Sequence, residues 1–270
     1  MNEMKYLERK TYTTGLIKGS GLIDETLSLI ELWEPEIDGR KLAKLAIERN
    51  AVSKVTARRT KDIVREFSHR YLVNGCKPAL YLKALFQSGV PLNQIKQLLT
   101  VYTSRAHPIL YDFIVNVYWD RVRNNHEYLE NDDARQFLNQ ELLNGNIESR
   151  WSDEVIKNIS TRLLTCLRDF NFVASDTTLK RQIVPISILS LTTLFLAHEI
   201  HFSGFSDNSI LESPEWALFG ISERGDVISE LRKASGDKVF ILQDSGDLLR
   251  ISWKYSSMEE LLNAFTRREL

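Results

Sequence analysis

Two histidines in this 270-residue chain are spaced closely enough to test for metal chemistry. His198 and His201 flank Glu199, an arrangement to compare with the zinc-protease motif. That motif needs histidines four residues apart on one helical face, whereas these are three apart and have no identifiable third ligand. We therefore interpret them as structural histidines near the end of a helix.

A glycine-rich segment, TTGLIKGSG at residues 13–21, is the second candidate. It lacks the Gly-Lys-Ser/Thr ending of a phosphate-binding loop, and no buried strand precedes it. Backbone amides and Lys18 ahead of a helix could still hold an anion. A flexible turn into that helix is the simpler interpretation.

Other catalytic signatures are missing from the sequence. Glu8 and Lys10 form the acid-x-Lys fragment of many nucleases, but no partner aspartate stands on a suitable strand. There is no Gly-x-Ser-x-Gly turn and no Cys–His pair, because Cys76 and Cys166 stand alone, 90 positions apart. We expect reduced, buried thiols, no metal, no cofactor and no enzymatic activity.

Basic residues concentrate between positions 40 and 73, where ten Lys and Arg face three acids. The pattern predicts a helix at 40–49, a short turn at 50–52, and a second helix beginning with Ser53 as its N-cap. Two helices joined by a few residues, the second basic near its start, indicate a helix-turn-helix that enters the DNA major groove.

The spacing of Lys54, Arg58, Lys61 and Arg65 places them on one exposed face of the second helix. Val55, Ile63, Val64 and Phe67 would then point inward. Lys and Arg on such a face can bind phosphates, and Arg58 or Arg59 could read guanine edges. The alternative is a solvated face with ordinary ion pairs. The predicted DNA-binding residues of this region are Lys44, Lys54, Arg58, Arg59, Lys61 and Arg65.

Two later regions have the same order of helix, helix and β-ribbon, as in a winged helix-turn-helix. In 133–184, the candidate DNA contacts are Arg150, Lys157 and Arg162 on or before a helix, and Lys180 and Arg181 on the wing. Asp153 and Glu154 at the helix start would repel phosphate, so a packing unit is the alternative. In 207–247, nine acids face four bases, which favours docking of a protein.

The hydrophobic periodicity predicts a compact, mainly α protein with a small C-terminal β-hairpin. We expect a short β-ribbon at 172–184 and hairpin strands at 239–243 and 248–253. The expected helices cover 22–33, 40–49, 53–72, 77–87, 91–102, 109–123, 133–143, 152–170, 186–200, 214–219, 222–234 and 258–268.

Charge and composition divide the chain. Its 35 Lys and Arg against 36 Asp and Glu leave a net charge of −1, which conceals a basic half at 1–123 and an acidic half at 124–270. We expect two domains with these limits, separated by the polar stretch 124–133. The 17 uncharged residues from Gln182 to His198 are too few to span a bilayer and predict a buried helix in a cytoplasmic protein.

Several segments together resemble the BrxA family, the accessory components of BREX bacteriophage-exclusion systems. They are Tyr12–Lys18, Leu22–Thr26, Trp151–Glu154 with the following Leu163, Leu164 and Leu167, Phe170–Phe172, Ile251–Trp253 and Met258–Glu260. The resemblance implies an all-helical protein with helix-turn-helix units at 40–72 and 133–170. It also implies binding of double-stranded DNA beside a methyltransferase and other defence proteins, without catalysis.

The leading hypothesis is a non-enzymatic, double-stranded DNA-binding accessory protein of a BREX system, monomeric on its own. One alternative is a scaffold whose acidic half docks other defence components. Another is an RNA-binding, antiterminator-like module, which would need exposed aromatic side chains beside the basic surface.

Overall fold

The computed structural model describes residues 11–52, 55–147, 151–174, 180–236, 239–246 and 248–267. The fold is mainly α with a C-terminal hairpin, which confirms the predicted class. Within the described ranges the chain forms two compact units. The larger unit comprises 11–83 and 99–186, and the smaller unit comprises 84–98 and 187–267. Both units draw on both halves of the sequence, and the expected pair of domains that divides at 123/124 stays a prediction.

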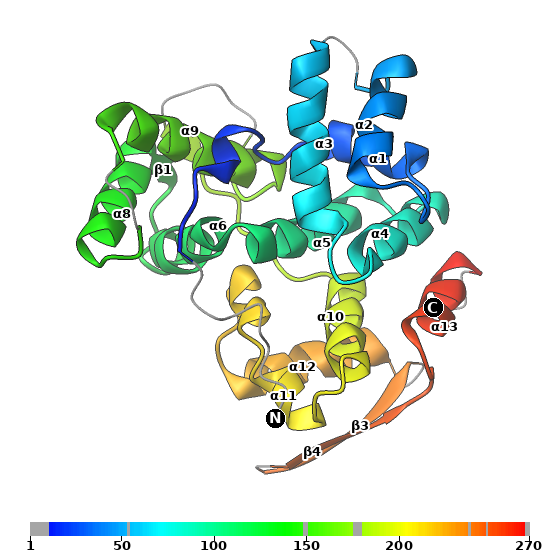
Figure 1. Ribbon diagram of the computed structural model, residues 1–270. Coiled ribbons are helices and arrows are strands. Elements are labelled where there is room, and N and C mark those ends of the chain that lie inside the picture. The colour runs from blue at the N-terminus through cyan, green and yellow to red at the C-terminus, as the bar shows by residue number, and fades with distance from the viewer. Residues whose placement is uncertain are drawn as a thin grey trace. The chain divides into compact units, whose positions relative to one another are not determined.

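Three helices pack together near the start of the larger unit (Figure 1). They are α1 (Ile23–Leu32), α2 (Gly39–Glu48) and α3 (Ala57–Tyr71). Their apolar faces meet in a core that includes Ile30, Leu42, Ile63 and Phe67, all buried. Burial of these side chains stabilises helices that are too short to persist alone.

The cap residues set where α2 and α3 begin. The Asp38 carboxylate accepts hydrogen bonds from the backbone amides of Arg40 and Lys41, at 2.9 and 2.8 Å. Thr56 caps α3 by accepting from the amide of Arg59, so the expected start at Ser53, which lies outside the described residues, is wrong by about one turn. Eight residues therefore connect α2 to α3, more than the three or four of a standard helix-turn-helix.

The chain continues through α4 (Lys77–Gln87), α5 (Leu92–Ala106) and α6 (Pro108–Phe113). A π-helical turn, η3 (Ile114–Tyr118), leads directly into α7 (Trp119–Arg123), so the helix expected at 109–123 exists with a bulge inside it.

A small β structure follows in the larger unit. Strand β1 (Tyr128–Glu130) precedes α8 (Asn131–Leu143) and α9 (Asp153–Asp169), and β2 (Lys180–Gln182) comes after them. β1 and β2 pair antiparallel, and Val173 bridges to Ile183. The β-ribbon expected at 172–184 is therefore present. It also pairs with β1, which lies in the polar stretch 124–133 that was expected to separate two domains.

The smaller unit contains α10 (Ser190–Phe202), α11 (Asp207–Leu211), η4 (Pro214–Phe219), α12 (Arg224–Ser235) and α13 (Met258–Thr266). Strands β3 (Phe240–Ser245) and β4 (Leu248–Trp253) form the predicted antiparallel hairpin. The second half of the uncharged run from Gln182 to His198 lies in α10, whose residues 191–198 are buried. Within the described ranges, no helix combines the length and apolar character that a membrane crossing requires.

Side chains of α11 close one edge of the hairpin. Asp207 accepts a hydrogen bond from the amide of Ile251 at 2.8 Å, and Asn208 accepts from that of Leu249 at 3.0 Å. The indole of Trp253 also donates to Asp207. These carboxylate and amide oxygens take the place of a neighbouring strand on the β4 side.

Candidate nucleic-acid interface

The outer face of α3 carries three exposed cations, as the spacing predicted. Arg58, Lys61 and Arg65 all reach solvent, and at about 100° per residue they fall within an arc of about 60°. Arg65 also pairs with Asp62 on the same helix. Lys54 lies outside the described residues. Val55, expected to be buried, is 37% exposed because the helix begins only at Ala57.

A shallow groove of about 640 Å³ runs between α2 and α3 beside this face. Its cations are Arg40, Lys61 and Arg65, and its apolar lining includes Ala43 and Val64. Gly39 brings the helices close, since a Cβ atom there would lie 2.7 Å from the Ser68 hydroxyl. The remaining predicted residue of α2, Lys44, is exposed and pairs with Glu48.

Arg40 belongs to this surface although the sequence analysis did not single it out. The sequence feature that indicates its position is the N-cap residue Asp38. Asp38 accepts a hydrogen bond from the backbone amide of Arg40 and so fixes Arg40 in the first turn of α2. Only the packing of α2 against α3 places its side chain at the same groove as Lys61 and Arg65.

Arg59 has a different environment from Arg58. Its guanidinium donates a hydrogen bond to the backbone carbonyl of Lys18, in the loop that follows the short helix η2 (Gly15–Ile17). Arg59 is half-buried, and Lys18 itself is exposed. Arg59 therefore ties the N-terminal loop to α3, and base reading by Arg59 stays a prediction.

The same loop is clamped from the inner side of α3 by Arg70. This fully buried guanidinium donates to the carbonyls of Gly19 at 2.7 Å, Ser20 at 2.9 Å and Gly21 at 3.4 Å. The loop thus turns carbonyl oxygens, rather than amides, toward the nearest charge. That orientation argues against the anion site considered from the sequence.

Glycine is required in this loop by close approach. A Cβ atom on Gly21 would collide with the side chain of Asp169 on α9, and one on Gly19 would collide with Leu22. Gly21 also donates its amide to the Asp169 carboxylate at 3.1 Å. The segment therefore links α3 to α9 through these contacts, and the flexibility expected of the turn stays a prediction.

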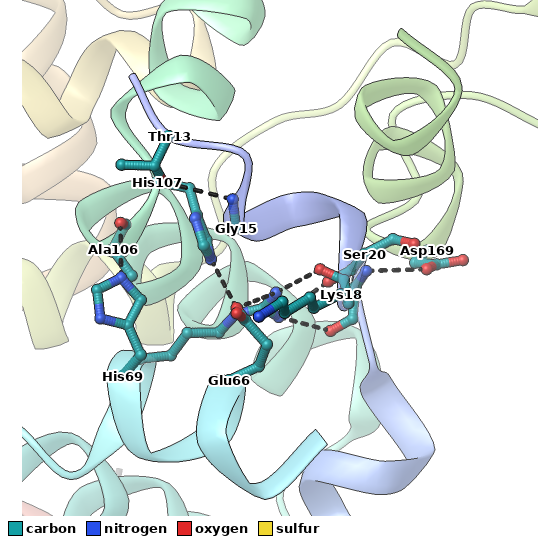
Figure 2. Close-up of polar contacts among 12 residues, drawn as sticks. Thr13, Gly15, Lys18, Ser20, Glu66, His69, Ala106, His107 and Asp169 are labelled. Atoms are coloured by element: carbon teal, nitrogen blue, oxygen red, sulfur yellow. Dashed lines mark hydrogen bonds and ion pairs between the residues drawn. The ribbon is translucent and has the colours of Figure 1, made fainter. Parts of the chain in front are cut away.

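Glu66 lies beside His107 inside the larger unit (Figure 2), and it also pairs with Arg70. Its Oε2 lies 3.5 Å from Arg70 and 3.0 Å from Nε2 of His107. Burial alone would raise the pKa of Glu66, but the His107 hydrogen bond and the nearby positive charges bring it below its ordinary value. Burial lowers the pKa of His107 to about 4, so a neutral His107 donates to an ionised Glu66. The cluster is buried and serves the fold.

The second predicted group of cations, in 133–184, is more dispersed. Lys157 on α9 is exposed and Arg162 is half-buried, while Arg150 lies outside the described residues. On the wing, Lys180 pairs with Glu130 at 3.0 Å and Arg181 donates to Asn131 at 3.4 Å. These contacts tie β2 to β1 and to the start of α8.

The two histidines tested for zinc binding sit in an aromatic cluster of the smaller unit. His198 is buried, contacts the carbonyl of Leu194 through Nδ1 at 2.7 Å and packs edge-on against Trp253. His201 stacks on the Trp253 ring, with 4.2 Å between the ring centroids. Among the residues that the structure describes, no group of three or more His, Cys, Asp or Glu could hold a metal ion.

A family model named BrxA matches residues 10–199, which include the α1–α3 cluster, the clamped loop and the β1–β2 region. The chain belongs to the BrxA family. Members of BrxA are accessory components of BREX phage-defence systems, and BrxA is not a known enzyme family.

Structural comparison supports the fold alone. A crystal structure of an uncharacterized protein from Magnetospirillum magneticum matches with a TM-score of 0.57 and 16% identity, covering 79% of this chain and 100% of that one. Comparison with curated proteins gives no significant match.

Proposed function

We propose that this BrxA protein is a non-enzymatic accessory factor that binds double-stranded DNA through the outer face of α3. The observation that carries the proposal is the exposed arc of Arg58, Lys61 and Arg65. An α-helix with its side chains is about 10–12 Å across, and the major groove of B-DNA is about 12 Å wide. The face is therefore compatible with insertion into that groove.

Burial leaves the surplus of positive charge in this region at its surface, because it removes one acid and one base together. Of the three acids in 40–73, Glu66 is buried and is neutralised internally by Arg70. Glu48 and Asp62 remain near the surface, where they pair with Lys44 and Arg65. Among the described cations of this region, Arg40, Arg58 and Lys61 are exposed, and exposed cations can release counterions from DNA, which gives sequence-independent affinity.

The larger unit offers a second, weaker point of contact. The order β1, α8, α9 and β2, with β1 paired to β2, is that of a winged helix-turn-helix. The helix expected to enter DNA would be α9, yet Asp153 and Glu154 lie exposed in its first turn. We therefore propose α3 as the main contact and assign Lys157 and the wing a supporting role at most.

The test removes the three α3 cations by changing Arg58, Lys61 and Arg65 to Gln. A matched control removes three exposed cations elsewhere, at Lys77, Arg123 and Arg250. Binding to a random-sequence duplex is measured by fluorescence anisotropy from 50 to 300 mM salt.

Each lost phosphate contact lowers the slope of log K against log salt by about 0.9. With a phosphate contact from every one of the three cations the α3 variant would lose about 2.7 from the slope, and at 0.15 M salt roughly a hundredfold in affinity; each cation that contacts a base instead reduces this slope change by about 0.9. The control variant should keep the wild-type slope. Equal behaviour of the two variants would refute the assignment of α3, and no binding by the wild-type chain would refute DNA binding.

A protein-docking role for the smaller unit is the second candidate. The region 207–247 has nine acids against four bases, and Ile241 and Leu248 on the hairpin are 56% and 63% exposed. This proposal predicts a stable complex with another BREX component that survives salt concentrations at which DNA dissociates. RNA binding is disfavoured, because Phe67 and Tyr71 beside the basic face are buried. Competition between duplex DNA and single-stranded RNA tests this.

A further inference from the structure

Two exposed cations flank the outer face of α3, and each comes from a different element. Lys18 belongs to the clamped loop on one side, and Arg40 belongs to α2 on the other. The helical pattern that identifies Arg58, Lys61 and Arg65 includes neither residue. Lys18 and Arg40 lie beside α3 because the fold packs their two elements against that helix.

Helix geometry places these two elements on opposite flanks. At about 100° per residue, Arg59 lies about 100° around α3 from Arg58, and Arg59 binds the backbone of Lys18. In the other direction, Ser68 and Val64 lie about 80° and 120° from Arg58, and both line the groove shared with Arg40. The three cations of α3 fall between these flanks.

Both flanking cations stand on rigid supports. The carbonyls of residues 18 to 21 are held by Arg59 and Arg70, and a Cβ atom on Gly19 or Gly21 would collide with a neighbouring side chain. Arg40 stands in a helical turn fixed by the Asp38 cap. A rigid support lowers the entropy lost when the side chain binds.

We propose that Lys18 and Arg40 bind the two phosphate backbones that border the groove occupied by α3, an inference that rests on the proposed DNA binding. A helix inserted in the major groove points its outermost residues at base edges, while cations on its flanks face the phosphates on either side. Lys18 and Arg40 thus set position and affinity, and the central residues, Arg58 above all, contact bases.

The experiment uses the full chain with Lys18→Gln, Arg40→Gln and the double variant. Lys41→Gln is the matched control for Arg40, because it removes an exposed charge from the next position of α2, about 100° away. Lys77→Gln is the control for Lys18. Thermal unfolding confirms that all variants fold as the wild type does, and the salt dependence of binding to a random duplex is then measured.

Each flanking variant should reduce the slope of log K against log salt by about 0.9, and the double variant by about 1.8. At 0.15 M salt this is roughly a fivefold loss of affinity for each. The ratio of affinities for different duplex sequences should not change, because phosphate contacts carry no sequence information.

The two proposals fail in different ways. If the wild-type chain binds duplex DNA and the α3 triple variant does not, while Lys18→Gln and Arg40→Gln keep the slopes of their controls, the flanking role is refuted and the α3 assignment stands. If the wild-type chain shows no salt-dependent binding, DNA binding itself fails, and the flanking role fails with it.

Discussion

Replacing Arg70 by methionine should strongly destabilise the larger unit. Methionine fills much of the same space but donates no hydrogen bond, so the carbonyls of Gly19, Ser20 and Gly21 lose their shared partner. Glu66 also loses a cation 3.5 Å away and keeps only His107. Removing one partner of a buried ion pair costs about 3–5 kcal/mol.

We expect a loss of about 4 kcal/mol in the free energy of unfolding. The three carbonyls add less than their separate values, because the loop can turn toward water once it is released. For a unit of this size, each kcal/mol lowers the melting temperature by about 2–4 °C, so the transition of the larger unit should fall by roughly 8–16 °C.

The assay is urea denaturation followed by tryptophan fluorescence, together with thermal unfolding by circular dichroism. Arg65→Met on the exposed face of the same helix is the control and should change stability by about 0.5 kcal/mol or less. Combining Arg70→Met with Glu66→Gln removes the unpaired carboxylate and should recover part of the loss. A cost below about 1 kcal/mol for Arg70→Met would show that the clamp does not hold the loop.

Two further predictions concern buried groups in the two units. Burial lowers the pKa of both His107 and His198 to about 4, so between about pH 6.5 and 4 the unfolded chain binds protons that the folded chain does not. Stability should therefore fall as the pH drops through this window, by up to about 1.4 kcal/mol per pH unit for each histidine. Urea titrations at several pH values should show this slope, reduced in His198→Gln; the same slope in the variant would contradict the assignment. Separately, Asp207→Ala leaves the amide of Ile251 and the indole of Trp253 without their acceptor and should cost about 1–3 kcal/mol. Amide exchange should accelerate at Ile251 and not in β1, and unchanged protection at Ile251 would refute the edge-closing role.

The outer face of α3 could be predicted from the sequence because its cations repeat with the period of the helix. The shared face of Arg58, Lys61 and Arg65 follows from their spacing alone, without knowledge of the helices that pack against α3. The start of the helix was harder to place, since Ser53 and Thr56 are both good N-caps and stand only three positions apart. The choice of Thr56 moved Val55 from the expected core to the surface.

Features that depend on distant contacts escaped prediction. Strand β1 has three residues and exists by pairing with β2, some fifty positions later. Arg70 has the sequence character of a surface residue, yet it is buried because the loop before α1 supplies carbonyl oxygens. Lys18 and Arg40 reach the candidate interface only through tertiary packing, for which a helical pattern carries no signal.

The two sides of α3 place different constraints on variation within the family. The inner side holds Glu66, Phe67 and Arg70, and a change at any of them disturbs packing or leaves a buried group without its partner. The outer cations support no neighbouring element through packing, so they can be exchanged while the chain still folds. Substitutions at positions 58, 61 and 65 can therefore change what α3 binds while the fold is kept. A library randomised at those three positions should yield folded proteins at high frequency, with altered binding preferences among them.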